Sequence, residues 1–260
     1  MIKALFFDID GTLVSFNTHK IPASTVAALE QAKAAGQKVV IATGRPQQLI
    51  NNLGAIEHLI DGYVTTNGAY CYAGNDVVVC DPIPAADALS IKAEADKLGA
   101  MMFAVGLDGI IVCNPDTALV RQFQAMLNIP DIPIGNDISP LLKRGIVQIT
   151  AFVPATDEPR LLLGAASSHG SRWYPAFTDI TSSQADKASG IDAMAAHFGI
   201  TAAETMAFGD GGNDTPMLRH AGIGVAMGNA LPDVKAAADH VTTAVDDDGV
   251  ARALRHFGII

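Results

Sequence analysis

Two acidic residues follow one of the most apolar runs in the chain. The stretch "LFFDIDGTL" at residues 5–13 places Asp8 and Asp10 one residue apart, directly after three residues typical of a buried strand. Along an extended strand, side chains two residues apart point the same way, and Gly11 allows the chain to turn away next. Two carboxylates so placed can take different roles in a group-transfer reaction: one attacks as the nucleophile, and the other donates and accepts the proton.

Further polar residues follow other predicted strands. Thr43 ends "KVVIAT", Lys187 begins a predicted helix, and Asp210 lies in "GDGGND". Ligands of open parallel sheets gather at the carboxyl ends of the strands, so we expect these side chains to share one edge. Converging carboxylates repel one another unless a hard cation lies between them, and Mg²⁺ prefers oxygen ligands together with a substrate phosphate. The sequence therefore predicts a Mg²⁺ site that handles phosphate.

Donors for the phosphoryl oxygens are present in the same segments. The ammonium group of Lys187 and the hydroxyl of Thr43 can meet charge that develops on these oxygens, together with backbone N–H groups beside Ile9 and Gly44. Even with Mg²⁺ and the lysine present, the carboxylates and a doubly charged phosphate leave the site net negative. This field favours the acid form of Asp10 and makes it a plausible proton donor.

The rest of the chain has the pattern of an α/β fold. Apolar runs of about five residues alternate with helix-like stretches, which indicates a mostly parallel sheet covered by helices. "GYVTTNGAY" is a predicted strand whose turn at Asn67 and Gly68 leads into the hairpin "AYCYAGNDVVVC".

The pattern of predicted helices and strands changes after residue 82. The predicted elements there are a helix after two prolines, a strand pair, a second helix, a strand, a third helix and a closing strand, in the order "AADALSIKAEADKLG", "MMFAV" with "GIIVC", residues 116–127, "GIVQITAFV", "DEPRLLLGAASSHG" and "SRWYPAFTDI". We therefore predict a Rossmann-like parallel-sheet core at 1–82 and 182–260, interrupted by an α+β domain at 83–181.

Composition excludes several classes of protein. The 260 residues carry a formal net charge of −10 with no basic block, which argues against nucleic-acid binding. No apolar stretch reaches the ~18 residues of a membrane span, and the apolar part of the first residues is too short for a signal peptide, so we expect a cytoplasmic protein without membrane contact. The sequence gives no indication of the oligomeric state.

Four motifs carry a family resemblance. "DIDGT", "ATGR", "DKASG" and "GDGGND", in this order, resemble the motifs of the haloacid dehalogenase-like hydrolase superfamily. Together with "TTNGA" and "GVAMGNALPDVKAAADHVT" they resemble its Cof-type branch of sugar and cofactor phosphatases. The resemblance covers roughly 1–82 and 182–260. It implies a Mg²⁺-dependent phosphatase that acts through an aspartyl-phosphate on small phosphorylated metabolites, with a cap domain inserted between the second and third motifs.

The resemblance also implies a role for each motif residue. By it, Asp8 is the nucleophile and a Mg²⁺ ligand, Asp10 is the acid/base whose backbone carbonyl also binds the metal, and Asp210 is the third ligand. The phosphate would be held by four residues, with Asp214 in support: Thr43, Gly44, Lys187 and Asn213. Arg45 and Asn67 are near enough to the predicted edge in the sequence to contact substrate.

Other functions use similar residues. A phosphomutase has the same aspartate pair but returns the phosphoryl group to a second site on the substrate. A receiver-type signalling module combines Asp, Thr and Lys at a sheet edge, although it lacks "GDGGND" and a large insertion. A non-catalytic phosphate-binding protein would leave Asp10 without a purpose. The sequence does not select the metabolite, because no motif identifies the residues of the insertion that choose it.

Overall fold

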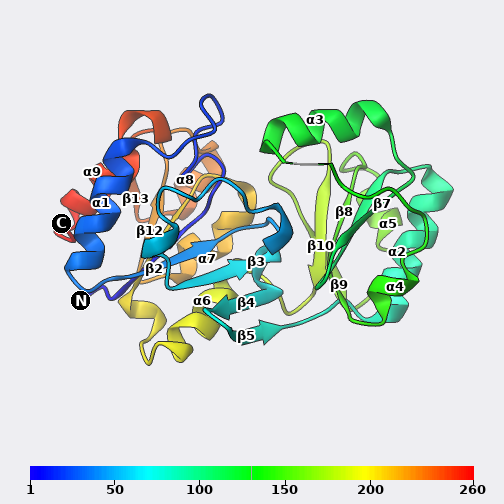
Figure 1. Ribbon diagram of the computed structural model, residues 1–260, viewed down its shortest axis with the longest axis horizontal. Helices are drawn as coiled ribbons and strands as arrows, with labels where there is room; N and C mark the ends of the chain where they lie inside the picture. Colours follow the sequence, from blue (N-terminus) through cyan, green and yellow to red (C-terminus); the bar gives the residue numbers. More distant parts are fainter. Residues whose placement is uncertain (130) are drawn as a thin grey trace. The chain divides into compact units, whose positions relative to one another are not determined.

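The computed structural model describes residues 1–129 and 131–260 (Figure 1). They form two compact units. No helix among these described residues combines the length and the apolar character needed to cross a membrane. The first unit comprises 1–45, 50–79 and 186–260, and the second comprises 46–49 and 80–185. The changes of unit at 79/80 and 185/186 lie within a few residues of the predicted domain boundaries, 82/83 and 181/182, whereas the segment 46–49 was predicted as part of the core. That the second unit acts as a cap stays a prediction.

The first unit is built on an eight-stranded sheet. Neighbouring strands from β13 to β3 run parallel, and β4 is antiparallel to β3, as expected for a parallel sheet that ends in a hairpin. The strands in spatial order are β13 (His240–Val241), β12 (Ile223–Ala226), β11 (Thr205–Gly209), β1 (Ala4–Phe7), β2 (Lys38–Ala42), β3 (Gly62–Thr65), β4 (Tyr70–Ala73) and β5 (Asp76–Cys80).

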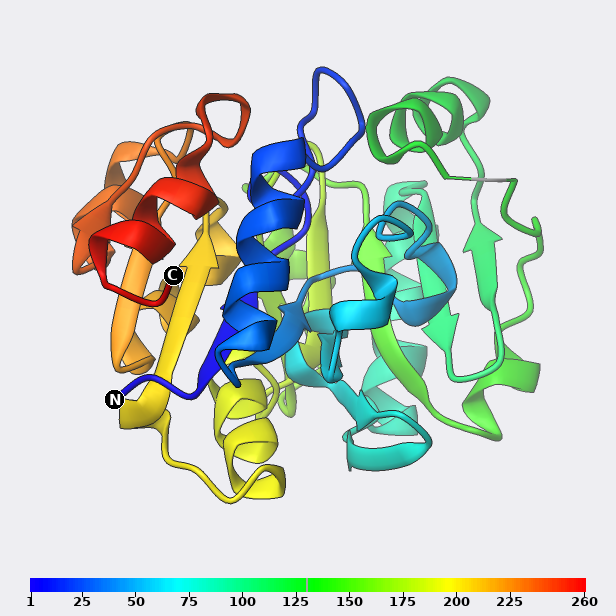
Figure 2. The same cartoon turned by 60° about the vertical axis from the view of Figure 1, so that its left-hand side comes forward.

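Helices cover both faces of this sheet. Leu5 and Phe7 of β1 pack against α1 and α9, which lie side by side (Figure 2), while Phe6 faces α6, α7 and α8. A central parallel strand is buried on both faces, and this is why β1 is apolar without alternation. The helices are α1 (Ala23–Ala34), α6 (Lys187–His197), α7 (Thr215–His220), α8 (Pro232–Ala237) and α9 (Gly249–His256). Short 3₁₀ turns lie at Glu57–Leu59, Thr66–Gly68, Ala202–Glu204, Gly212–Asp214 and Val245–Asp247.

Three strands and one helix of this unit end or begin at the motif residues. β1 ends at Phe7, β2 at Ala42 and β11 at Gly209, each directly before a polar motif residue. α6 begins at Lys187, where Asp186 caps the helix by accepting from the backbone N–H of Ser189 at 2.7 Å. The fold therefore places the motif residues at the carboxyl ends of neighbouring strands.

The second unit contains a five-stranded sheet. Ile91 of α2 and Leu141 of α4 pack on one face of this sheet, and on the other face Phe103 meets Phe123 of α3 with ring centroids 5.0 Å apart. The strands in spatial order are β7 (Ile110–Cys113), β6 (Met102–Gly106), β8 (Ile146–Ala151), β10 (Thr178–Ser182) and β9 (Ser168–Ser171). The helices are α2 (Ala85–Leu98), α3 (Thr117–Leu127), α4 (Ser139–Leu142) and α5 (Glu158–Leu161), and a 3₁₀ turn lies at Gln47–Leu49.

One predicted helix of this unit is wrong. Of "DEPRLLLGAASSHG" only Glu158–Leu161 is helical, and Ser168–Ser171 is a strand instead. Gly164, with a φ of +77°, lies in the backbone region where a right-handed helix cannot continue. Among the residues that the structure describes, β9 pairs with β10 alone, and all four of its residues are half-buried. Its sequence, "SHGS", contains no apolar alternation by which a strand could be recognised.

Candidate active site

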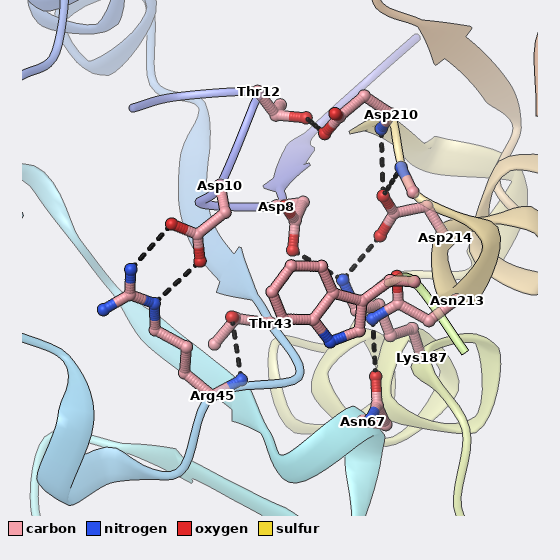
Figure 3. Close-up of polar contacts among 12 residues, drawn as sticks. Asp8, Asp10, Thr12, Thr43, Arg45, Asn67, Lys187, Asp210, Asn213 and Asp214 are labelled. Atoms are coloured by element: carbon pink, nitrogen blue, oxygen red, sulfur yellow. Dashed lines mark hydrogen bonds and ion pairs between the residues drawn. The ribbon is translucent and has the colours of Figure 1, made fainter. Parts of the chain in front are cut away.

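A buried lysine joins two of the motif carboxylates. Lys187 has no exposed surface, and its Nζ donates to Oδ1 of Asp8 at 2.6 Å and to Oδ1 of Asp214 at 2.5 Å (Figure 3). Burial by itself lowers the pKa of Lys187, but the two carboxylates outweigh it and raise that pKa above the ordinary value. The ammonium group is therefore a fixed positive charge at the carboxyl ends of the strands.

Asp8 lies in a crowded acidic environment. Burial raises the pKa of Asp8 well above its ordinary value; Lys187 opposes this rise, whereas Asp214, Asp210 and Asp10 add to it. In the same way, burial first and Asp214 second raise the pKa of Asp210 to about 7. Carboxylates that repel one another in a largely buried site bind a proton or a divalent cation readily.

The carboxylate of Asp210 is held through both of its oxygens. Oδ1 accepts from the hydroxyl of Thr12 at 2.9 Å, and Oδ2 accepts from Nδ2 of Asn229 at 3.1 Å. Asn229 also donates to the carbonyl of Gly11 at 2.9 Å and accepts from the backbone N–H of Val245 at 3.0 Å. Sequence reasoning missed Thr12 and Asn229 as site residues, although "DIDGT" and "GVAMGNALP" were noted as family motifs.

Three carboxylates could hold a metal ion. Asp8, Asp210 and Asp214 each offer one oxygen, and these oxygens lie within 4.8 Å of one another. Asp214 is already engaged, because its Oδ1 accepts from Lys187 and its Oδ2 accepts from the backbone N–H groups of Asp210 at 2.9 Å and Gly211 at 2.8 Å. The donor set has the oxygen chemistry that suits Mg²⁺, with Asp8 and Asp210 as its more available members.

The side chain of Asp10 has a different partner from that of the Asp8 side chain. Its two carboxylate oxygens accept from Nε and Nη2 of Arg45, both at 2.7 Å, and the guanidinium is almost fully buried (Figure 3). The strand ends at Phe7 and the chain then turns, so the expectation that Asp8 and Asp10 lie along one extended strand is wrong. The net charge expected from the sequence also omitted the positive charge of Arg45, which forms this ion pair with Asp10. A contact between Arg45 and substrate stays a prediction.

The predicted phosphate-holding residues lie in the same unit. The hydroxyl of Thr43, itself buried, accepts from the backbone N–H of Arg45 at 3.0 Å. Asn213 donates from Nδ2 to Oδ1 of Asn67 at 2.9 Å, directly beside Gly44. The side chain of Ile9 is fully buried, which leaves only its backbone for a ligand. Thr43, Asn213 and Lys187 therefore come from three different segments that the fold brings together.

Comparisons with known proteins agree with this geometry. A family model described as haloacid dehalogenase-like hydrolase matches residues 5–254. The chain belongs to this family. A haloacid dehalogenase-like hydrolase is an enzyme, and the family resemblance drawn from the four motifs is thereby confirmed.

Several relatives of this haloacid dehalogenase-like hydrolase carry the names of phosphatases. The solved structure of the HAD subclass IIB sugar phosphatase BT4131 is 48% identical, covers 99% of this chain and 100% of its own, and has a TM-score of 0.95. The "Putative phosphatase YkrA" of Bacillus subtilis (strain 168) is 31% identical over 99% of this chain and 98% of its own length. The 5-amino-6-(5-phospho-D-ribitylamino)uracil phosphatase YitU of the same organism is 27% identical over 96% and 95%. The similarity to the BT4131 structure confirms the predicted Rossmann-like core with an inserted domain.

Proposed function

We propose that this protein is a Mg²⁺-dependent phosphatase that hydrolyses the phosphate monoesters of small metabolites, sugar phosphates above all, through an aspartyl-phosphate on Asp8. The observation that carries the proposal is the anchoring of Asp8 by the buried Lys187 inside a cluster of carboxylates. A carboxylate fixed in this way is held ready for attack, and the ammonium group is placed to stabilise charge on the transferred phosphoryl group.

Asp8 supplies the nucleophile. Its Oδ1 is bound to Lys187, so Oδ2 is the oxygen that attacks phosphorus. The bond from Oδ2 to phosphorus forms as the bond from phosphorus to the leaving alcohol oxygen breaks. Lys187, the Thr43 hydroxyl, the Asn213 amide and the backbone N–H groups of Ile9 and Gly44 meet the charge on the remaining phosphoryl oxygens.

Asp10 supplies and removes the proton. In its acid form it protonates the leaving alcohol oxygen, and as a carboxylate it then takes a proton from the water that attacks the aspartyl-phosphate. Inorganic phosphate and regenerated Asp8 are the products. The two hydrogen bonds from Arg45 hold the Asp10 carboxylate in one orientation.

Magnesium fits the donor set. We assign Asp8, Asp210 and the backbone carbonyl of Asp10 as its protein ligands, with Asp214 in support because its oxygens already hold Lys187 and the loop. When bound, the ion neutralises the repulsion between carboxylate and phosphate and orients the phosphoryl group. Thr12 and Asn229 orient the Asp210 carboxylate toward the same place.

The substrate class is the finer part of the proposal. The sugar phosphatase BT4131 is 48% identical to this chain, and this similarity favours a sugar phosphate. A phosphorylated cofactor or its precursor is the second candidate, supported by the more distant likeness to a 5-amino-6-(5-phospho-D-ribitylamino)uracil phosphatase. A non-catalytic or receiver-type role is disfavoured by membership of a hydrolase family.

We expect the purified protein to release inorganic phosphate from hexose phosphates in the presence of Mg²⁺ and to lose this activity with EDTA. A colorimetric phosphate assay over a panel of sugar phosphates and phosphorylated cofactors measures the preference. Analysis of the same reactions for isomerised sugar phosphate separates hydrolysis from a phosphomutase reaction. Isomerised product without free phosphate would contradict the proposal.

Magnesium should stabilise the protein more strongly at pH 8 than at pH 5. The raised pKa values of Asp8 and Asp210 mean that protons, bound in the folded state, compete with the metal at low pH. Because a raised carboxyl pKa makes the folded state bind more protons than the unfolded one, the contribution of Asp210 to the stability of the metal-free protein falls as pH rises from about 4 to 7. Thermal unfolding with and without Mg²⁺ measures both effects, and Asp210→Asn should reduce the Mg²⁺-dependent shift. A shift that is equal at both pH values would count against this metal site.

A further inference from the structure

The turn that follows β3 has an unusual backbone. Thr66 and Asn67 have φ angles of +48° and +51°, in the left-handed region. Asn adopts this region more readily than most residues, but for a β-branched threonine it is a genuine outlier. Such a conformation persists only where the surrounding structure fixes it. The contacts of the turn, which we define as residues 65–68, identify what fixes it.

This turn lies between two segments that carry proposed phosphate ligands. The backbone N–H of Thr66 donates to the carbonyl of Arg45 and that of Asn67 donates to the carbonyl of Thr43, both at 3.1 Å. On its other side, a Cβ atom at Gly68 would overlap the carbonyl oxygen of Asp186, which precedes Lys187. The turn thus sets the spacing between the loop after β2 and the start of α6.

The side chain of Asn67 reaches a third segment. Its Oδ1 accepts from Nδ2 of Asn213 at 2.9 Å, and the Asn67 side chain is almost fully buried (Figure 3). Gly44 packs on this amide pair, since a Cβ atom at Gly44 would lie 3.2 Å from both of the bonded atoms. Nδ2 of Asn213 carries two N–H groups, so the bond to Asn67 fixes the direction of the other one.

The arrangement is not the one that stability alone would select. Nδ2 of Asn67 is buried and has no hydrogen-bond partner among the described residues. A buried unpaired donor is costly, and the left-handed backbone adds to that cost. Within the part of the chain that the structure describes, the Asn67 side chain has one hydrogen bond, which its Oδ1 accepts from Asn213.

We propose that Asn67 is a positioning residue that acts through Asn213: it fixes the Asn213 amide so that its second N–H meets a phosphoryl oxygen. The inference rests on the proposed function, in which Asn213 holds the phosphate. It differs from the direct substrate contact that the sequence allows for Asn67, because the role proposed here belongs to Oδ1, which is bound to Asn213 beside Gly44.

The test is a double-mutant cycle of Asn67→Gly and Asn213→Ala. Glycine adopts a positive φ without strain, so Asn67→Gly removes the side chain and keeps the turn. We expect Asn67→Gly to raise the inhibition constant of inorganic phosphate and to lower kcat/KM by about tenfold. Asn213→Ala should lower kcat/KM by at least the same factor. The double variant should have the same kcat/KM as Asn213→Ala alone, because coupled residues give non-additive losses.

Asn114→Gly is the matched control. Asn114 also has a left-handed backbone, with a φ of +49°, and its side chain also makes hydrogen bonds, to Asp96 and to the carbonyl of Ala100. The Asn114→Gly variant should have a changed unfolding temperature and an unchanged inhibition constant of phosphate. All assays are run well below the unfolding midpoint of each variant, so that lost stability does not imitate lost binding.

The outcomes separate the two proposals. Additive losses in the double variant, or an unchanged phosphate constant in Asn67→Gly or in Asn213→Ala, overturn the positioning role while the wild type remains an active phosphatase. A wild-type protein that releases no phosphate from any phosphomonoester in the presence of Mg²⁺ overturns the proposed function instead. A variant of Asn67 that loses stability but retains the wild-type phosphate constant assigns this residue a purely structural role and also overturns the inference.

Discussion

Replacing Asp8 with asparagine should lower kcat by at least about 10⁴-fold, because an amide oxygen is a far weaker nucleophile than a carboxylate. Asparagine has nearly the same shape and can still accept from Lys187, so the packing of the site is retained. Steady-state phosphate release measures the loss. In the wild type, rapid acid quenching with a ³²P-labelled substrate should trap label on the protein, and in Asp8→Asn it should trap none.

Asp192→Asn is the matched control for this variant. Asp192 lies on α6 like Lys187, but its side chain is 60% exposed and pairs with His220 away from the site. The same chemical change there should leave kcat within about twofold, since exposed ion pairs contribute little. A wild-type rate in Asp8→Asn, or label that remains bound to it, would show that the nucleophile lies elsewhere.

The core was predictable because its signals are local. Runs such as Leu5–Phe7 and Val39–Ala42 are apolar at every position, as strands buried on both faces require, and both are strands in the structure. The rule that ligands gather at the carboxyl ends of parallel strands then predicts that Asp8, Thr43 and Asp210 lie together. That step needed no side-chain detail.

The partners of these residues were not predictable in the same way. The contact between Arg45 and Asp10 was not predicted, because the chain leaves the strand direction after Phe7 and no periodicity indicates that turn. Asn229 reaches Asp210 and the carbonyl of Gly11 from a loop more than 200 residues away in the sequence from Gly11. Such contacts depend on how three loops approach one another, and residue types within a single loop do not specify this.

In the second unit, prediction from the sequence failed for a different reason. β9 lies at the edge of its sheet, and its residues are polar and half-buried, so nothing in "SHGS" distinguishes a strand from a loop. The preceding "LLLGAA" has helical character locally, and Gly164 decides against a helix only through its backbone conformation. Where burial is weak, the pairing with a neighbouring strand decides the structure, and that pairing is not local information.

Replacing Asp10 with asparagine should lower kcat for sugar phosphates by about 10²–10⁴-fold, the usual contribution of a positioned acid or base. An alkoxide is a poor leaving group without a proton, whereas 4-nitrophenolate leaves readily without one. Formation of the aspartyl-phosphate should therefore be slowed much less for 4-nitrophenyl phosphate than for a hexose phosphate. The measurement is the ratio of kcat/KM for 4-nitrophenyl phosphate to that for the hexose phosphate, which should rise in the variant.

Hydrolysis of the aspartyl-phosphate gives a second test of the role of Asp10 in the same Asp10→Asn variant. Asparagine cannot take a proton from the attacking water, so hydrolysis of the aspartyl-phosphate becomes the slow step for 4-nitrophenyl phosphate. Stopped-flow measurements should then show a burst of 4-nitrophenolate equal to the concentration of active sites, followed by slow turnover.

A comparison variant separates the lost base from the lost ion pair. Asp10→Asn also leaves Arg45 without its carboxylate partner, whereas Arg45→Lys weakens the two-bond contact with Asp10 but keeps the base. Arg45→Lys should therefore lower the rate without a burst. A burst in Arg45→Lys and none in Asp10→Asn would assign the proton transfer to a residue other than Asp10.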